Sequence, residues 1–268
     1  MINFKDTINQ LLSTGFREDN VEEKLSQDII IKALAECGLK ENLTIKGGVV
    51  MSNITNDIRR TTLDIDIDFI KFSLSDATIR DLVERMNCIE GISISIIGDI
   101  VELKQHDYHG KRVFLSLQDK YGNVIETKMD IGVHTIPEAQ QVEIPFQMLS
   151  INYETVTLFA NTNEQIFVEK LKSLLRLGAI SNRAKDVDDM IFLSERINRK
   201  DLLALIKVYI YNDTRMLENN IDEIISRVSK VFSDKNYLAR LSHRRSNWLE
   251  IEPQEATKRL LEFLRSLK

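Results

Sequence analysis

The pattern of apolar and polar residues predicts a front part of the chain that mixes helices and strands. Apolar residues recur at helical spacing in "FKDTINQLL" and "NVEEKLSQDIIIKALAECG", which predicts two N-terminal helices, the second ending at Gly38. A third helix is predicted in "SDATIRDLVERMN", where Ser75 or Asp76 can cap the first turn. Between Gly91 and His134, alternating and β-branched segments are separated by the turn signals "GD", "HG" and "YGN", which predicts a meander of strands.

The pattern becomes helical from about Gln165 and stays so to the end of the chain. Five segments carry apolar residues at helical spacing, and none is typical of a strand: "EQIFVEKLKSLLRLG", "AKDVDDMIFLSER", "RKDLLALIKVYI", "NIDEIISRVSKVF" and "ATKRLLEFLRSL". We therefore predict an α+β protein. A mixed β-sheet flanked by helices is expected over residues 1–150 and an all-helical region over 151–268, with the boundary between about 145 and 165.

Composition narrows the class of protein. A chain of 268 residues, 43% hydrophobic and 29% charged, can form one large domain or two modest ones. Two cysteines are too few for a disulfide framework and no apolar run of signal-peptide length follows Met1, so we expect a cytoplasmic protein with reduced thiols. No segment approaches the roughly 20 apolar residues that a membrane span needs. The net charge of -5 argues against a globally basic nucleic-acid binder.

Aspartates alternate with apolar residues in "RRTTLDIDIDF", Arg59 to Phe69. In a strand, successive side chains point to opposite faces, so the acids share one face and the apolar residues pack on the core. Acids so close together repel one another unless a cation lies between them, and hard carboxylates suit Mg²⁺ or Mn²⁺ better than Zn²⁺. The alternative is the solvated face of an edge strand, where charges discourage aggregation. The acids are Asp64, Asp66 and Asp68.

Two glycines precede this segment in "TIKGG". If Gly47 and Gly48 open the next helix, their amides and the helix dipole form an anion site with Lys46 beside it. A plain turn is the alternative explanation of a Gly-Gly pair.

A further acid lies in the alternating segment "VIETKMDIGV". Asp130 is out of phase with Met129 and Ile131, so it can stand beside Asp64 and Asp66 on a neighbouring strand. Three acids on two strands suit two-metal phosphoryl transfer, in which the ions hold the attacking and leaving oxygens. A buried salt-bridge aspartate is the alternative.

In the helical part, Lys170 lies at the border of the buried face and needs an anionic partner. Asp186 and Asp189 are three residues apart on one face of the next helix. Near the C-terminus, "YLARLSHRRSNWLE" suggests either a phosphate-binding and stacking surface or a helix end whose Trp248 fills the core, and we favour the second.

Taken in order, these fragments resemble the AbiEii/AbiGii nucleotidyltransferase toxins of the DNA polymerase β-like superfamily, found in type IV toxin-antitoxin systems. The matching text runs from about Glu22 to Leu193: "EEKLSQDIIIKAL", "IKGGVVM", "RRTTLDIDIDF", "TKMDIGVHT" and "EKLKSLLRLGAISNRAKDVDDMIFL". The resemblance implies a nucleotide and metal site at Lys46, Gly47, Gly48, Thr62, Asp64 and Asp66. Gly47-Gly48 departs from the Gly-Ser common in the superfamily, so the resemblance is closer for the metal contacts than for the phosphate contacts.

The resemblance also implies roles and partners. Lys170 would hold the triphosphate, with Asp186 and Asp189 orienting it or the acceptor, and Asp130 would ligate a second ion. The expected enzyme transfers a nucleoside monophosphate from a nucleoside triphosphate, with Mg²⁺ or Mn²⁺, to an acceptor such as the tRNA 3′ end. A cognate antitoxin is an expected partner. Two alternatives are transfer to a protein hydroxyl and a non-catalytic module that binds a nucleotide or a partner.

Overall fold

The computed structural model describes residues 2–62, 64–105, 108–243 and 247–268. The chain forms two compact units, Met1–Asn161 and Thr162–Lys268, called here the N-terminal and C-terminal units. The division falls after the last strand rather than at residue 150, because the chain between about residues 141 and 161 forms two more strands of the sheet. One of them carries Pro145, a residue that weakens a strand pattern in sequence but is tolerated at the edge of a sheet.

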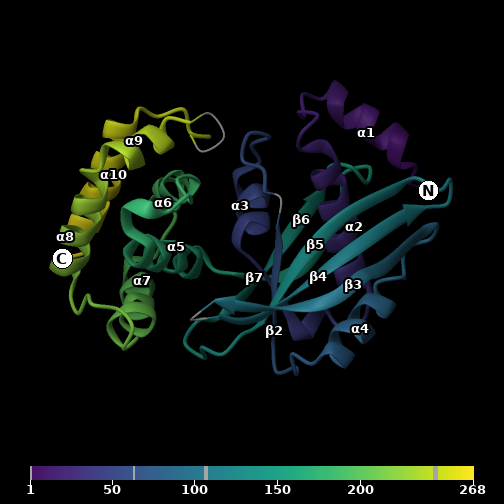
Figure 1. The fold of residues 1–268 in the computed structure, drawn as a ribbon, viewed down its shortest axis with the longest axis horizontal. Helices are drawn as coiled ribbons and strands as arrows, with labels where there is room; N and C mark the ends of the chain where they lie inside the picture. The colour runs from purple at the N-terminus through teal and green to yellow at the C-terminus, as the bar shows by residue number, and fades with distance from the viewer. Residues whose placement is uncertain (1, 63, 106–107, 244–246) are drawn as a thin grey trace. The chain divides into compact units, whose positions relative to one another are not determined.

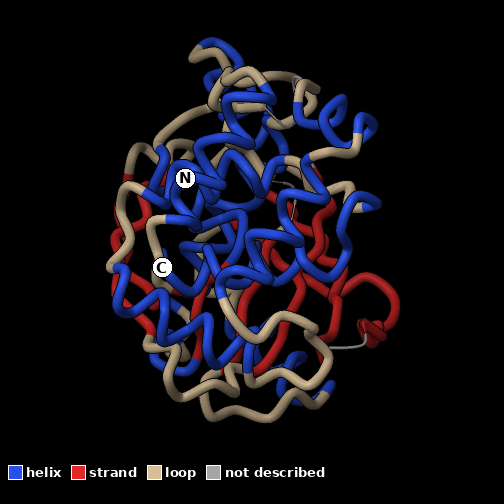
Figure 2. Tube along the Cα trace, turned by 90° about the vertical axis from the view of Figure 1, so that its left-hand side faces the viewer, coloured by secondary structure: helices blue, strands red, loops and turns tan. Residues whose placement is uncertain are grey.

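A mixed sheet forms the centre of the N-terminal unit, with strand order β3-β4-β5-β2-β1-β7-β6 (Figures 1 and 2). The pairs β2–β5 and β1–β7 are parallel, and the other neighbours are antiparallel. The predicted meander is confirmed as β3, β4 and β5. The strands are β1 (Leu43–Lys46), β2 (Ile65–Phe69), β3 (Ile92–Gln105), β4 (Tyr108–Asp119), β5 (Val124–Val133), β6 (Gln141–Met148) and β7 (Glu154–Asn161).

Helices of the N-terminal unit form where the sequence pattern predicts them. Ser75 caps α4 by accepting a hydrogen bond from the Thr78 amide at 3.1 Å. Lys46 is the last residue of β1, and Gly47 and Gly48 open α3 as expected. The helices are α1 (Phe4–Ser13), α2 (Val21–Glu36), α3 (Gly47–Thr55) and α4 (Asp76–Arg85), with a short 3₁₀ turn at Lys40–Asn42.

The two faces of the sheet differ in chemistry. α2 packs against β5, β6 and β7, and α4 packs against β3 (Figure 1). Alternate residues of the central strands are completely buried in the core, among them Ile65, Ile67, Met129 and Ile131. Because side chains alternate along a strand, the residues between them lie on the opposite face, which is the face of the predicted acids.

Every element of secondary structure in the described residues of the C-terminal unit is helical, which confirms the prediction for this part of the chain. No helix of the described chain is both long and apolar enough to cross a membrane. A π-helical turn at Lys207–Tyr211 follows α7, and a 3₁₀ turn at Gly178–Ile180 follows α5. The helices are α5 (Asn163–Leu177), α6 (Lys185–Ser194), α7 (Arg199–Ile206), α8 (Ile221–Phe232), α9 (Lys235–Leu241) and α10 (Pro253–Arg265).

Candidate active site

Four charged residues form a row across the polar face of the sheet, one from each of four adjacent strands. Asp66 of β2 is the register partner of Asp130 on β5 and of Lys46 on β1. Asp130 is in turn the register partner of Arg112 on β4. Register partners project to the same side of a sheet, so the order across the face is Arg112, Asp130, Asp66, Lys46. The structure thus brings Asp130 beside Asp66, as the alternation of "VIETKMDIGV" predicts.

Two of the acids are held by cations from β4 and β5. Arg112 donates two hydrogen bonds to Asp130, from Nε to Oδ1 at 2.7 Å and from Nη2 to Oδ2 at 2.8 Å. Such a fork fixes the plane of the carboxylate. Asp64 precedes β2, and its Oδ1 lies 2.8 Å from Lys128 Nζ. This oxygen is enclosed, yet among the described residues it has no partner in hydrogen-bonding geometry.

Asp68 departs from the sequence prediction, which placed it on an outward face with the other acids. Its side chain is buried, and Lys46 Nζ lies 3.1 Å from both of its carboxylate oxygens. Thr44, its register partner on β1, is also buried. Asp68 therefore neutralises and orients Lys46 at the end of β1.

Asp66 differs from its neighbours because no cation pairs with it. Within the described chain no side chain or amide forms a hydrogen bond or ion pair with its carboxylate. The pKa of Asp66 is raised to about 6, chiefly by burial, with Lys46 opposing the shift and the negative charges of Asp130, Asp64 and Asp68 adding to it. The carboxylate of Asp66 would therefore be stabilised by an added cation.

The two glycines at the start of α3 pack directly on the site residues. Gly47 has a positive φ of 62°, and a Cβ there would lie 2.8 Å from Asp66 Oδ2. A Cβ on Gly48 would lie 2.4 Å from Thr62 Oγ1. Both positions therefore exclude a side chain, and the first amides of α3 lie beside Asp66 and Thr62. The Gly-Gly pair is thus a close packing of backbone on site residues rather than a plain turn.

The acids are of the ligand type that divalent metal ions prefer, but their side chains are not already arranged as a metal-binding cluster. No three acidic, histidine or cysteine side chains among the described residues are arranged to hold a metal ion. The oxygen donors of Asp64, Asp66 and Asp130 are nevertheless hard ligands, of the kind Mg²⁺ and Mn²⁺ prefer. The carboxylate of Asp66, raised in pKa by burial and by its acidic neighbours, is the group that such an ion would stabilise most.

In the C-terminal unit, Lys170 of α5 is held by the two acids of α6. Its Nζ lies 2.5 Å from Asp186 Oδ1 and 2.8 Å from Asp189 Oδ2. This confirms that Lys170 has anionic partners and that the two acids share a face of α6. Asp189 is completely buried, and its other oxygen accepts a hydrogen bond of 3.0 Å from Trp248 Nε1.

Trp248 is a core residue, as favoured from the sequence. It is 3% exposed and lies against Phe192, with the ring centres 5.6 Å apart. The next residue, Leu249, donates its amide to Asp188 at 3.0 Å. The basic positions Arg244 and Arg245 of the same stretch lie outside the described residues.

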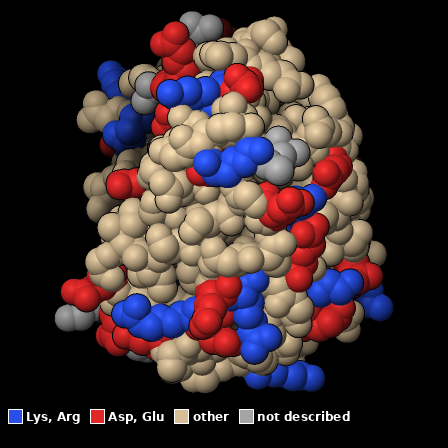
Figure 3. All heavy atoms as spheres, turned by 90° about the vertical axis from the view of Figure 1, so that its right-hand side faces the viewer, with Lys and Arg blue, Asp and Glu red and all other residues tan. Residues whose placement is uncertain are grey.

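Charge is mixed on the face of the molecule in Figure 3. Acidic and basic side chains are interspersed around a broad area of uncharged residues. This mixture agrees with the modest net charge of -5.

Arg112 and Lys128 were missed by the sequence analysis. A signal for Arg112 was present: β4 and β5 are joined by the "DKYGN" turn, and counting outward from it places residue 112 opposite 130. Lys128 is two residues before Asp130 and therefore shares its face. The Trp248 contact with Asp189 had no such signal, because 59 residues separate the partners.

The chain is similar to known proteins. The family model described as "Nucleotidyl transferase AbiEii toxin, Type IV TA system" matches residues 29–261. A search of curated proteins finds no match. Among solved structures, an antigenic nucleotidyltransferase-like protein from Paracoccidioides brasiliensis aligns with 86% of this chain and 94% of its own, at 15% identity and a TM-score of 0.45. On the extent of the family match, the chain belongs to the AbiEii nucleotidyl transferase toxin family.

Proposed function

We propose that this nucleotidyltransferase moves a nucleoside monophosphate from a nucleoside triphosphate to a hydroxyl of an RNA, such as the tRNA 3′ end, and releases pyrophosphate. Membership of the family gives nucleotidyl transfer in general. The metal ion and the acceptor are our proposal. A cognate antitoxin and a cytoplasmic location are part of the same proposal, because the family is described as the toxin of a type IV system.

The observation that carries the proposal is the pairing of Asp66 with Asp130 on adjacent parallel strands. Asp66 is a half-buried carboxylate with no cationic partner of its own, beside a second acid that an arginine holds in a fixed plane. Binding a divalent ion there removes the unfavourable isolation of the Asp66 charge. Asp64, Asp66 and Asp130 are the residues we assign to Mg²⁺ or Mn²⁺.

The chain's own residues contribute positioning and charge. When bound, the metal supplies neutralisation of phosphate charge and polarisation of the oxygens in transfer. The first amides of α3, from Gly47 and Gly48, offer hydrogen bonds and the positive end of the helix dipole to phosphate oxygens. Lys46, oriented by Asp68, adds a positive charge at the same helix start.

Three further roles complete the proposal. We assign to Asp130 the removal of the proton from the attacking hydroxyl, and Arg112 holds the orientation of this carboxylate. Thr62 packs on Gly48 and supports the helix start. We assign triphosphate binding to Lys170, whose ammonium Asp186 and Asp189 hold in place within the C-terminal unit.

Labelling with each of the four α-³²P nucleoside triphosphates tests the reaction and the acceptor together. The protein is incubated with Mg²⁺, total bacterial RNA and soluble bacterial protein, and Asp64→Ala is the matched control. We expect label on RNA with the unmodified chain, none with Asp64→Ala, and none when EDTA replaces Mg²⁺. Label on protein alone would overturn the RNA acceptor in favour of transfer to a protein hydroxyl. Absence of label on both, from protein that still binds nucleotide, would contradict turnover with these acceptors and favour a binding module.

A further inference from the structure

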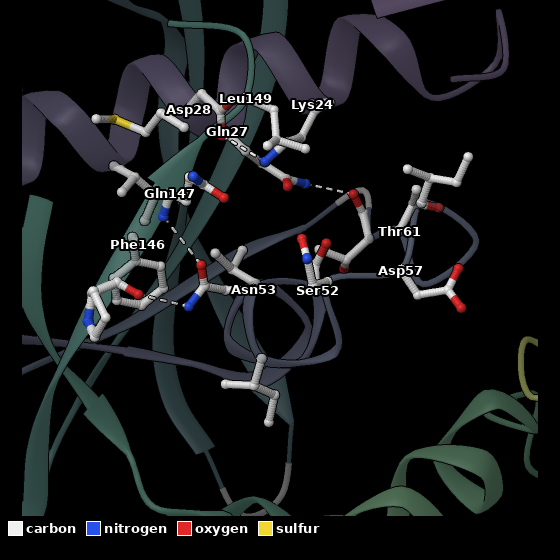
Figure 4. A pocket seen from close by; sticks show the side chains of 18 of the residues that line it. Lys24, Gln27, Asp28, Ser52, Asn53, Asp57, Thr61, Phe146, Gln147 and Leu149 are labelled. Carbon is white, nitrogen blue, oxygen red and sulfur yellow. Dashed lines mark hydrogen bonds and ion pairs between the residues drawn. The ribbon is translucent and has the colours of Figure 1, made fainter. Parts of the chain in front are cut away.

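A pocket of about 610 Å³ lies inside the N-terminal unit, apart from the charged row. Residues of α2, α3, β6 and the segment from Asn56 to Thr62 line it (Figure 4). Its volume is within the roughly 300–1,000 Å³ of ordinary small-molecule sites. Asp64, Asp66 and Asp130 are not among its lining residues, so the metal site does not account for it.

The walls of the pocket are tied together by side-chain amides. Asn53 reaches from α3 to β6, where it donates to the Pro145 carbonyl at 2.9 Å and accepts from the Gln147 amide at 3.3 Å (Figure 4). Gln27 reaches from α2 and donates to the Thr62 carbonyl. These bonds connect the surrounding segments across the cavity, which makes it a preformed site rather than a gap between mobile parts.

The charged side chains that line the pocket are neutralised within the protein. Lys24 Nζ lies 2.7 Å from Asp28 Oδ1, and the other oxygen of Asp28 accepts two hydrogen bonds from Ser150. Asp57 is gripped by Arg59, and the resulting hydrogen bonds lower the pKa of Asp57. A phosphate or a metal ion would meet no uncompensated charge here, so the expected ligand is uncharged.

The remaining lining groups define what such a ligand must offer. Apolar side chains supply surface for van der Waals contact: Phe16, Ile31, Val49, Ile54, Ile58 and Phe146. Four uncharged polar side chains, Asn20, Ser52, Asn56 and Gln147, also line the pocket and form no hydrogen bond among the described residues. An aromatic ring with hydrogen-bond donors and acceptors on its edge would contact the apolar side chains and bond to the polar ones at the same time.

We propose that this pocket binds an uncharged heteroaromatic molecule of nucleoside size. The site is distinct from the proposed transfer site but adjoins it along the chain. Thr62 lines the pocket, packs on Gly48 and stands two residues before Asp64. An occupant would therefore contact the segment that leads into the charged row.

Binding of the four free nucleosides, measured by isothermal titration calorimetry without metal, tests the proposal. Unphosphorylated nucleosides do not depend on the charged row, so the result is independent of nucleotidyl transfer. Ser52→Trp on α3 and Gln147→Trp at an exposed strand position each fill the cavity. Tyr121→Trp, at an exposed residue that does not line the pocket, is the matched control, and Asp66→Asn tests independence from the charged row. Thermal melting by circular dichroism checks the fold of every variant.

We expect at least one nucleoside to bind, with at least about tenfold weaker binding in both Trp variants, equivalent to about 1.4 kcal/mol. Tyr121→Trp and Asp66→Asn should bind within about threefold of the unmodified chain, or about 0.7 kcal/mol. The proposal is overturned if no nucleoside binds at millimolar concentration, if the Trp variants bind normally, or if Asp66→Asn abolishes binding. Should Ser52→Trp fail to fold, Gln147→Trp decides the question, because its position is exposed.

Discussion

The two units of this protein both place aspartates beside a lysine, but with opposite electrostatic outcomes. In the C-terminal unit, the completely buried Asp189 is matched by Lys170 on one oxygen and by the Trp248 indole on the other. In the N-terminal unit, Asp66 is half-buried without a matching cation, and its pKa rises to about 6. The same residue type therefore stabilises the fold in one unit and opposes it in the other.

We expect this difference between acids that hold the fold together and the acids that we propose to be catalytic. A buried carboxylate that is fully hydrogen-bonded holds its neighbours in place, and removing it leaves other buried groups without partners. A buried carboxylate without partners is retained at a cost in stability, which is understandable if a ligand supplies the missing charge. The comparison predicts opposite responses to mutation in the two units.

The largest expected effect is on catalysis at the unmatched acid. Asp66→Ala should lower the rate of nucleotide transfer at least about a thousandfold, or about 4 kcal/mol of activation free energy. Its free energy of unfolding should not fall. Single-turnover transfer and urea denaturation measure the two quantities, and a loss of stability parallel to the loss of rate would break the comparison.

The matched acid should respond in its stability instead. Asp189→Ala leaves Lys170 and the Trp248 indole with fewer partners, and should lower the free energy of unfolding by about 3 kcal/mol. Trp248 is the single tryptophan of the chain, so its fluorescence during urea denaturation reports on the C-terminal unit. Asp186→Ala, at a partly exposed side chain, is the control and should cost less. Equal losses in the two variants would contradict the role given to Asp189.

The pH dependence of stability sharpens the comparison at Asp66. A folded-state pKa of about 6, above the ordinary 3.8, means that the folded protein binds the proton more tightly. The contribution of protonated Asp66 to the free energy of unfolding is therefore complete below about pH 4 and is lost as the pH rises through 6. Without metal at pH 8, the free energy of unfolding of Asp66→Asn should exceed that of the unmodified chain by on the order of 2 kcal/mol.

The greater stability of Asp66→Asn should disappear near pH 4. Unfolding midpoints of both chains, measured at several pH values, check this expectation. Mg²⁺ at pH 8 should raise the melting temperature of the unmodified chain more than that of Asp66→Asn, because binding to the folded state adds stability. An equal response of the two chains to Mg²⁺ would remove Asp66 from the metal ligands.

The smallest expected effect comes from the helix start beside the row. Gly48→Ala places a Cβ within 2.4 Å of Thr62 Oγ1, and should destabilise the chain by about 1–2 kcal/mol as Thr62 shifts. Ser52→Ala, on the same helix, should change stability by less than about 0.5 kcal/mol. Thermal melting compares the pair, and a harmless Gly48→Ala would mean that this packing is loose.

Much of the fold was predictable because local patterns agree with it. The helices at residues 4–13 and 21–36 and the meander of β3 to β5 follow from periodicity and turn signals. β6 was not predicted, since its proline obscures the pattern and only its edge position makes it possible. Strand order was also beyond prediction, because it depends on pairings between distant segments such as β1 with β7.

Within the site, alternation was enough to place Asp130 on the face of Asp66, but not to assign the cations. Asp68 was predicted to face outward with the other acids, yet it is buried against Lys46. Alternation says which face a side chain takes and nothing about what covers that face. The packing of Gly47 against Asp66 likewise depends on how α3 leaves β1, which no local pattern reports.

The parallel pairing of β1 with β7 has a consequence for how the protein is made. Lys46 and Asp66 are synthesised early, but the neighbour that completes the sheet on their side, β7, ends only at Asn161. Until then β1 is an unpaired edge, and contacts between segments so distant in sequence form slowly. The nascent chain therefore cannot complete this sheet before about 160 residues have been translated, and a fragment that stops earlier should aggregate rather than fold.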